Sequence, residues 1–208
     1  MSIFLHYGDI KTIIKRCPVT SLLILVNSFF LLITIISGGI VEGFKFGNLV
    51  RLGGLVPSYV FAGEYYRLFI TMFLHGSVIH YLFNTFFGLL ILGAGLEKLI
   101  GSIKFLIIYL FSGLVSSLFV LVFSYSEDLT IGASGAVFGV LGAFLFIILF
   151  KKNLLSFSDR TYIRNLLIVN LIFTFVTPFI SKSGHLGGLI TGFILGFVLL
   201  INKNNYYY

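Results

Sequence analysis

The sequence is poor in charged residues, and this scarcity excludes most kinds of soluble protein. Asp, Glu, Lys and Arg together make up 10% of the 208 residues, whereas hydrophobic residues make up 58%. Soluble globular domains carry about 25% charged residues and a smaller apolar share. The composition therefore predicts a membrane protein whose chain crosses the bilayer several times.

Cysteine is also scarce, since the single Cys17 cannot form an intrachain disulfide. Basic residues outnumber acidic ones by 14 to 7, but this excess does not predict a nucleic-acid partner. In membrane proteins Lys and Arg accumulate in cytoplasmic loops, and their distribution here follows that rule. We expect contact with a lipid bilayer and no nucleic acid.

Acidic residues are missing from the interior of the apolar runs, which excludes several chemistries. An aspartyl protease needs two carboxyl groups that share a proton, and all seven acidic residues fall in expected loops or at span ends. A zinc protease would need His-Glu-x-x-His, which is absent, and four scattered histidines make a poor metal site. A small transporter stays open as an alternative, although no acidic residue could serve a relay along its path. We expect no metal and no cofactor.

Six apolar runs predict six membrane spans. They cover residues 19–37, 70–96, 103–123, Ser134–Phe150, 166–180 and 185–201. The intervening residues 38–69 are too interrupted to span, and we expect a first external loop that lies half-submerged in the interface. A short basic segment (1–18) precedes the spans and a short tail (202–208) follows them. The predicted fold is an all-α, six-transmembrane-helix bundle in residues 19–201.

The distribution of Lys and Arg predicts the orientation. Ten of them lie in the amino-terminal segment, around residues 97–104 and 151–165, or in the tail, whereas four lie on the other side. The positive-inside rule then places both termini in the cytoplasm of a multi-pass cell-membrane protein. The second, fourth and sixth spans consequently begin near the outer face at a similar depth.

Polar residues gather near the beginnings of these three spans. Ser134 opens the fourth span in a glycine-rich stretch, residues 131–139, and His185 opens the sixth. His80 and Asn84 are four residues apart near the outer part of the second span, so they share a helix face. Ionisable groups within spans usually face a bundle interior or a water-filled cavity, which makes these residues site candidates.

Each candidate also has a purely structural interpretation. A serine at a helix start is commonly a cap or bonds to the helix backbone, and a histidine such as His80 can serve an interhelical hydrogen bond. His75 lies five residues earlier, on a different helix face, and we interpret it as structural. Small-residue helix packing with no chemistry would explain Gly135, Gly139, Gly188, Gly192 and Gly196. Packing alone does not explain the coincidence of polar groups on three co-oriented spans.

The chemistry that remains is a serine activated by a histidine base. With no carboxyl group inside the spans, Ser134 and one histidine would form a dyad rather than a triad. Asn84 and the other histidine could donate hydrogen bonds to an oxyanion. Tight backbone approach around the serine is suggested by Gly132, Gly135 and Gly184.

At these residues the chain resembles the rhomboid family of intramembrane serine proteases, in its bacterial six-span form. The shared motifs are Gly132-Ala133-Ser134-Gly135, His80-x-x-x-Asn84, Gly93-x-x-x-Glu97-x-x-x-Gly101, and Gly184-His185-Leu186-Gly187-Gly188 followed by Gly192. The resemblance covers the chain from about residue 19 onward.

The resemblance implies a role for each candidate. Ser134 would be the nucleophile and His185 the general base, and the oxyanion hole would consist of His80, Asn84 and the Ser134 backbone N–H. Phe138, one turn after the serine, resembles the aromatic residue that packs on the base, where many members have Tyr. The expected close-packing glycines are Gly132, Gly135, Gly184 and Gly188. The Trp-Arg pair of the family's first loop is replaced by Tyr66-Arg67.

We therefore expect an intramembrane serine endopeptidase that acts on single-span transmembrane substrates near the external membrane face. A helix in lipid satisfies its own backbone hydrogen bonds, so it must unwind before cleavage. We expect a small residue at the scissile bond and helix-weakening Gly or Pro just beyond it. The alternative is a non-catalytic rhomboid-like factor that binds membrane proteins or acts as a chaperone, although both the serine and the base are present.

Overall fold

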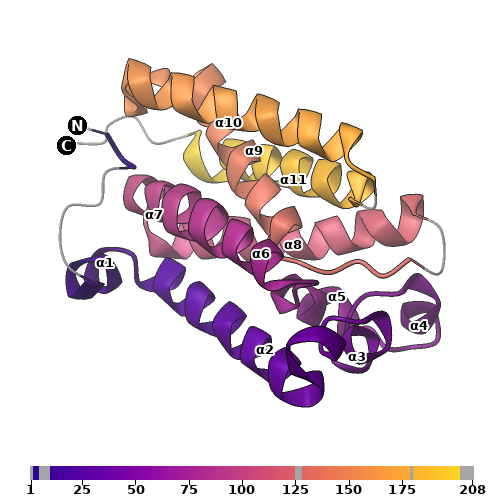
Figure 1. Cartoon of the computed structure of the whole chain (residues 1–208). Coiled ribbons are helices and arrows are strands. Elements are labelled where there is room, and N and C mark those ends of the chain that lie inside the picture. The colour runs from indigo at the N-terminus through magenta and orange to yellow at the C-terminus, as the bar shows by residue number, and fades with distance from the viewer. Residues whose placement is uncertain (1, 5–9, 125–127, 179, 202–208) are drawn as a thin grey trace.

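The computed structural model describes residues 2–4, 10–124, 128–178 and 180–201, and its regular elements are helices (Figure 1). The expected tail at residues 202–208 lies outside the described residues, as does Phe179 near the end of the expected fifth span. The prediction of an all-α membrane bundle is confirmed.

Four described helices are long and apolar enough to cross a membrane. They are α2 (Pro18–Glu42), the continuous helix Val78–Ile100, α8 (Ser102–Phe123) and α11 (Lys182–Leu200). The helix Val78–Ile100 consists of α6 (Val78–Leu82), the π-helical segment η2 (Phe83–Gly93) and α7 (Ala94–Ile100). A shorter apolar helix, α9 (Ser134–Phe150), and the partly charged α10 (Phe157–Val176) occupy the remaining two predicted spans.

Several predicted spans differ from the helices that form, and the second and fifth differ most in where they begin. The first ends at Glu42 rather than at residue 37, and the sixth begins at Lys182 rather than at residue 185. α10 begins at Phe157 rather than at residue 166, because the Ser156 hydroxyl caps it by accepting a hydrogen bond from the backbone N–H of Asp159 at 3.1 Å. It ends at Val176, shortly before Pro178, since a proline disfavours helical backbone in the residue before it. The second span begins at Val78 rather than at residue 70.

The residues before Val78 form separate short turns. α5 (Arg67–Ile70) is followed by the 3-10 turn η1 (Thr71–Phe73) and then by an irregular segment. The new helix begins where the Ser77 hydroxyl accepts a hydrogen bond from the backbone N–H of His80 at 3.0 Å. This cap places His80 in the first turn of the span.

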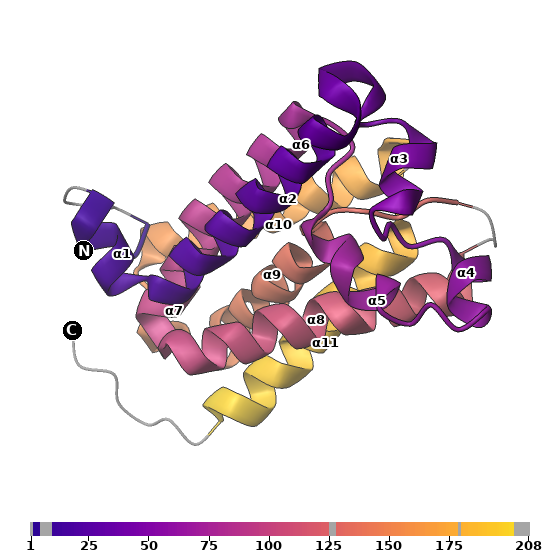
Figure 2. The same ribbon diagram turned by 90° about the horizontal axis from the view of Figure 1, so that it is seen from below.

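Helix α9 lies in the middle of the bundle, with α8 and α11 packed against it (Figures 1 and 2). Most of its residues from Gly135 to Ile147 are buried. The backbones of α9 and α11 touch: a Cβ added at Gly188 would collide with the carbonyl oxygen of Gly135, and one at Gly192 with that of Gly139. Small residues therefore bring the beginnings of α9 and α11 close together.

Three short helices lie together at one end of the bundle (Figure 2). They follow a break at Gly39 (φ +75°) in α2. They are α3 (Phe46–Arg51), α4 (Pro57–Phe61) and α5. Arg67, only 4% exposed, donates to the carbonyl oxygens of Val50 at 2.6 Å and Gly54 at 2.8 Å. One guanidinium thus fixes the fold of this segment.

At the opposite end, α1 (Ile10–Arg16) precedes α2, and Glu97 holds the beginning of α2 (Figure 1). Its buried carboxyl group accepts hydrogen bonds from the backbone N–H groups of Val19 at 3.0 Å and Thr20 at 2.8 Å. It also accepts one from the Ser102 hydroxyl at 2.6 Å. Glu97 of α7 is therefore bonded to both α2 and α8, which gives the motif Gly93-x-x-x-Glu97-x-x-x-Gly101 a structural role. The short turn η3 (Lys152–Leu154) connects α9 to α10 at this end.

Candidate active site

Ser134 and His185 meet at the end of the bundle that carries α3, α4 and α5. Ser134 is the first residue of α9 and does not cap it, because the cap position belongs to Ala133. The Oγ atom of Ser134 instead lies 2.8 Å from Nε2 of His185, although the two residues are 51 positions apart. This distance is within the hydrogen-bonding reach that a nucleophile and its base require.

The imidazole of His185 is fixed from several sides. Ser181 caps α11 by accepting a hydrogen bond from the N–H of Gly184 at 3.2 Å, which starts the helix just before His185. The ring of Phe138 stacks on the imidazole with centroids 4.1 Å apart and an angle of 17° between the planes. His185 is consequently 8% exposed.

Thr174 of α10 is a neighbour of His185 that the sequence analysis did not identify. Its hydroxyl lies 2.8 Å from Nδ1 of His185. The same hydroxyl lies 2.8 Å from the carbonyl oxygen of Asn170, one turn earlier in α10, and must donate to it. A threonine in the apolar second half of α10 carries no sequence signal for such a contact, because the contact depends on how α10 packs beside α11.

His80 and Asn84 share a helix face, as their spacing predicts. The side-chain amide of Asn84 donates to the carbonyl oxygen of His80 at 3.0 Å, and Asn84 is 7% exposed. The His80 ring lies against the loop before Ser134, since a Cβ added at Gly132 would be 2.8 Å from its Nε2 atom. Gly132 has a φ of +117°, so both its backbone conformation and this contact require glycine.

Backbone hydrogen bonds tie the loop before Ser134 to the segment between α2 and α6. Leu55 and Thr130 form an isolated antiparallel bridge, with N···O distances of 3.2 and 2.8 Å. Thr71 accepts a hydrogen bond from the N–H of Gly132 at 2.9 Å, and its hydroxyl donates to the carbonyl oxygen of Thr130. The position of the loop that delivers Ser134 therefore depends on residues 55–71.

His75 lies closer to the site than its sequence position suggests. We expected it on a different helix face from His80, but it lies in the irregular segment before α6, and the two ring centroids are 5.1 Å apart. Its Nδ1 atom lies 3.2 Å from the carbonyl oxygen of Phe73. This contact fixes the orientation of the His75 ring, which packs against the ring of His80.

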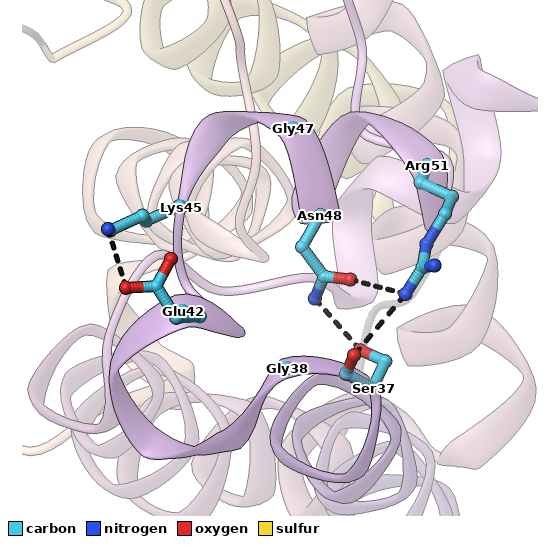
Figure 3. Close-up of a pocket in the computed structure, with 7 residues that line it drawn as sticks. All are labelled: Ser37, Gly38, Glu42, Lys45, Gly47, Asn48 and Arg51. Atoms are coloured by element: carbon cyan, nitrogen blue, oxygen red, sulfur yellow. Dashed lines mark hydrogen bonds and ion pairs between the residues drawn. The ribbon is translucent and has the colours of Figure 1, made fainter.

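A hollow of about 490 Å³ lies elsewhere, between the end of α2 and α3 (Figure 3). Its polar side chains bond to one another: Lys45 pairs with Glu42 at 2.6 Å, and Asn48 bonds to Ser37 and Arg51, each at 2.8 Å. None of the residues that line it belongs to the group formed by Ser134, His185, His80 and Asn84. Across the part of the chain that the structure describes, no three His, Cys, Asp or Glu side chains are grouped to hold a metal ion.

Comparisons with known proteins agree on one family. The family model of the Rhomboid domain matches residues 62–202. Rhomboid protease GluP of Bacillus subtilis is 38% identical over 156 residues, which are 75% of this chain but 30% of that protein. The putative rhomboid protease YdcA of the same organism is 32% identical over 145 residues, 70% of this chain and 72% of YdcA. Inactive rhomboid protein 1 of Bos taurus is 36% identical over 140 residues, which cover 16% of its length.

Proposed function

Because this chain belongs to the rhomboid family, whose members include intramembrane proteases, we propose that it is a serine endopeptidase that hydrolyses peptide bonds of transmembrane proteins. The observation that carries the proposal is the 2.8 Å contact between Ser134 Oγ and His185 Nε2. Ser134 is the nucleophile and His185 the general base of a dyad.

In the first step Ser134 Oγ attacks the carbonyl carbon of the scissile bond while Nε2 of His185 takes the hydroxyl proton. The carbonyl π electrons move onto oxygen, which gives a tetrahedral oxyanion and an imidazolium. Phe138 supports this step, because its stacked ring keeps the imidazole plane aligned with the serine.

The oxyanion needs preorganised hydrogen-bond donors. The first N–H groups of a helix have no acceptor within it, so the Ser134 N–H at the start of α9 is a donor of this kind. Nδ1 of His80 accepts a hydrogen bond from the N–H of Gly76 at 3.4 Å, which leaves the proton of a neutral ring on Nε2, beside Gly132. Asn84 uses an amide hydrogen on His80, and its amide group has a second one to donate.

Collapse of the oxyanion breaks the C–N bond, and the His185 imidazolium gives its proton to the departing amine. Ser134 then holds the acyl group as an ester. Water attacks this ester, and His185 Nε2 takes a proton from the water. Collapse of the second oxyanion then returns that proton to Ser134 Oγ. The products are a carboxylic acid and an amine, and the dyad is restored.

The location of the dyad determines the substrate class that we propose. Both residues lie in the first turns of α9 and α11, at the end of the bundle that the positive-inside rule assigns to the external face, with both termini in the cytoplasm. Substrates would be single-span proteins cut near the external end of their helix. A small residue at the scissile bond fits the close backbone packing around Gly135 and Gly188.

A non-catalytic rhomboid-like binding factor is the second candidate, since one relative carries the name inactive rhomboid protein. One experiment separates the two functions: the purified chain and Ser134→Ala are each incubated with a model single-span protein, in detergent and in lipid vesicles. Cleavage by the wild type alone supports the protease, whereas binding without cleavage by both proteins supports the factor.

A substrate whose Gly and Pro are replaced by Leu should be cut more slowly if unwinding limits access.

A further inference from the structure

We propose that Thr174 is a positioning residue that holds His185 in the tautomer a general base requires. This inference rests on the proposed function of the Ser134 and His185 pair. It concerns a contact that lies outside the shared motifs, on a different helix from both members of the dyad.

The direction of two hydrogen bonds carries the argument. A threonine hydroxyl has one proton, and that of Thr174 is donated to the carbonyl oxygen of Asn170, which can only accept. Toward His185 the Thr174 oxygen can therefore only accept, so Nδ1 of His185 must carry a hydrogen. Because a neutral imidazole carries one N–H, its Nε2 atom is left with a free lone pair.

The free lone pair faces the nucleophile. With Nε2 unprotonated, the 2.8 Å contact is a hydrogen bond from the Ser134 hydroxyl to His185, which is the arrangement needed for proton removal. The opposite tautomer would carry its hydrogen on Nε2 and could not accept the serine proton. In serine proteases with a triad, a buried aspartate holds the base in the correct tautomer. Thr174 provides an uncharged acceptor at the equivalent ring atom.

Stacking by Phe138 does not replace this contact. A ring stacked at 4.1 Å fixes the plane of the imidazole, but it is compatible with either tautomer and with rotation of the ring within that plane. A hydrogen bond at one edge distinguishes Nδ1 from Nε2. Burial strengthens the preference, because Thr174 is 0% exposed and water does not compete for its oxygen.

The test compares three full-length variants in the same lipid vesicles. Thr174→Val removes the hydroxyl with little change of shape, and Thr174→Ser keeps it. Thr34→Val is the matched control, since Thr34 is also 0% exposed and also donates to the carbonyl oxygen four residues earlier at 2.8 Å. We expect Thr174→Val to lower kcat roughly tenfold with little change in KM, because one neutral hydrogen bond is lost.

The expected pattern has two further parts. Thr174→Ser should keep kcat within about twofold of the wild type. Thr34→Val should also keep kcat within about twofold, although its melting temperature should fall about as much as that of Thr174→Val. Nitrogen-15 NMR of histidine-labelled protein, assigned with His185→Ala, should find the hydrogen on Nδ1 in the wild type and a mixture of tautomers in Thr174→Val.

Two results would overturn the positioning role: a wild-type hydrogen on Nε2, or a Thr174→Val kcat equal to that of Thr34→Val. Either would leave the protease function intact if Ser134→Ala is inactive. A wild type that hydrolyses nothing would instead remove the proposed function. In that case the NMR measurement alone would decide whether Thr174 orients the ring.

Discussion

The phenyl ring of Phe138 lies flat on the imidazole of His185, with ring centroids 4.1 Å apart. Phe138 follows Ser134 by one turn on the same helix, so the residue that supports the base also comes from the helix that carries the nucleophile. This side-chain contact between α9 and α11 therefore adds to the close packing of their glycines in setting the distance between serine and base.

This contact predicts a graded response at position 138. Phe138→Leu keeps an apolar side chain but loses the stacked ring, and an aromatic pair is worth about 0.5–1.5 kcal/mol beyond its buried area. We expect kcat to fall by roughly three- to tenfold, and we expect Phe138→Tyr, which keeps the ring, to stay close to the wild type. Steady-state cleavage kinetics measure both. Equal kcat values for the Leu variant and the wild type would show that stacking does not position the base.

We expect the substitution Glu97→Ala to lower the stability of the protein without lowering its catalytic activity. Replacing it with Ala leaves the N–H groups of Val19 and Thr20 without their acceptor, and loss of a helix cap costs about 0.5–2 kcal/mol. The melting temperature should fall, while the specific activity of the folded fraction stays unchanged.

Glu42→Ala is the control for this measurement. Glu42 forms an ion pair with Lys45, and the two side chains are 64% and 62% exposed. Exposed ion pairs contribute about 0–1 kcal/mol, so this variant should melt near the wild type. Equal melting temperatures for the two Ala variants would contradict the role of Glu97.

The segment between α2 and α6 should be sensitive to acid. Hydrogen bonds from Tyr66 and then from Arg67 hold the pKa of Glu64 below its usual value of 4.5. A lowered folded pKa contributes stability that is present above the unfolded pKa and is lost as the pH falls through the folded pKa. The difference in melting temperature between the wild type and Glu64→Gln should therefore be constant above pH 4.5 and shrink below it. A difference that grows toward acid pH would contradict this assignment.

Cysteine accessibility tests the proposed orientation. In a Cys17→Ser background, single cysteines at Asp128 and Lys182 should react with an impermeant reagent added outside intact cells. Cysteines at Lys98 and Lys152 should react only after the membrane is opened, since the ten-to-four distribution of basic residues predicts that they lie in the cytoplasm. External labelling at position 152 would reverse the orientation and move the dyad to the cytoplasmic face.

Sequence reasoning succeeded where local chemistry decides the structure. The fourth span was predicted as Ser134–Phe150, and α9 has these bounds because an apolar run follows the glycine-rich loop directly. The shared face of His80 and Asn84 follows from the four-residue spacing alone.

Sequence reasoning failed where a helix cap or a tertiary contact determines the structure. Hydropathy placed the fifth span at residues 166–180, whereas the hydroxyl of Ser156 starts α10 within a charged stretch. The anchoring of Val50 and Gly54 by Arg67 depends on a turn that joins distant residues. The contact of Thr174 with His185 requires the packing of α10 against α11, which no spacing within one helix predicts.

The central claim is that the Ser134 hydroxyl is a nucleophile activated by His185. The most direct measurement is covalent labelling by a fluorophosphonate probe, with the modified residue located by mass spectrometry in the wild type, Ser134→Ala and His185→Ala. We predict one labelled site, Ser134, in the wild type, no labelling of Ser134→Ala, and strongly reduced labelling of His185→Ala, with all three proteins folded. Labelling of another residue, or equal labelling after loss of His185, would contradict the account.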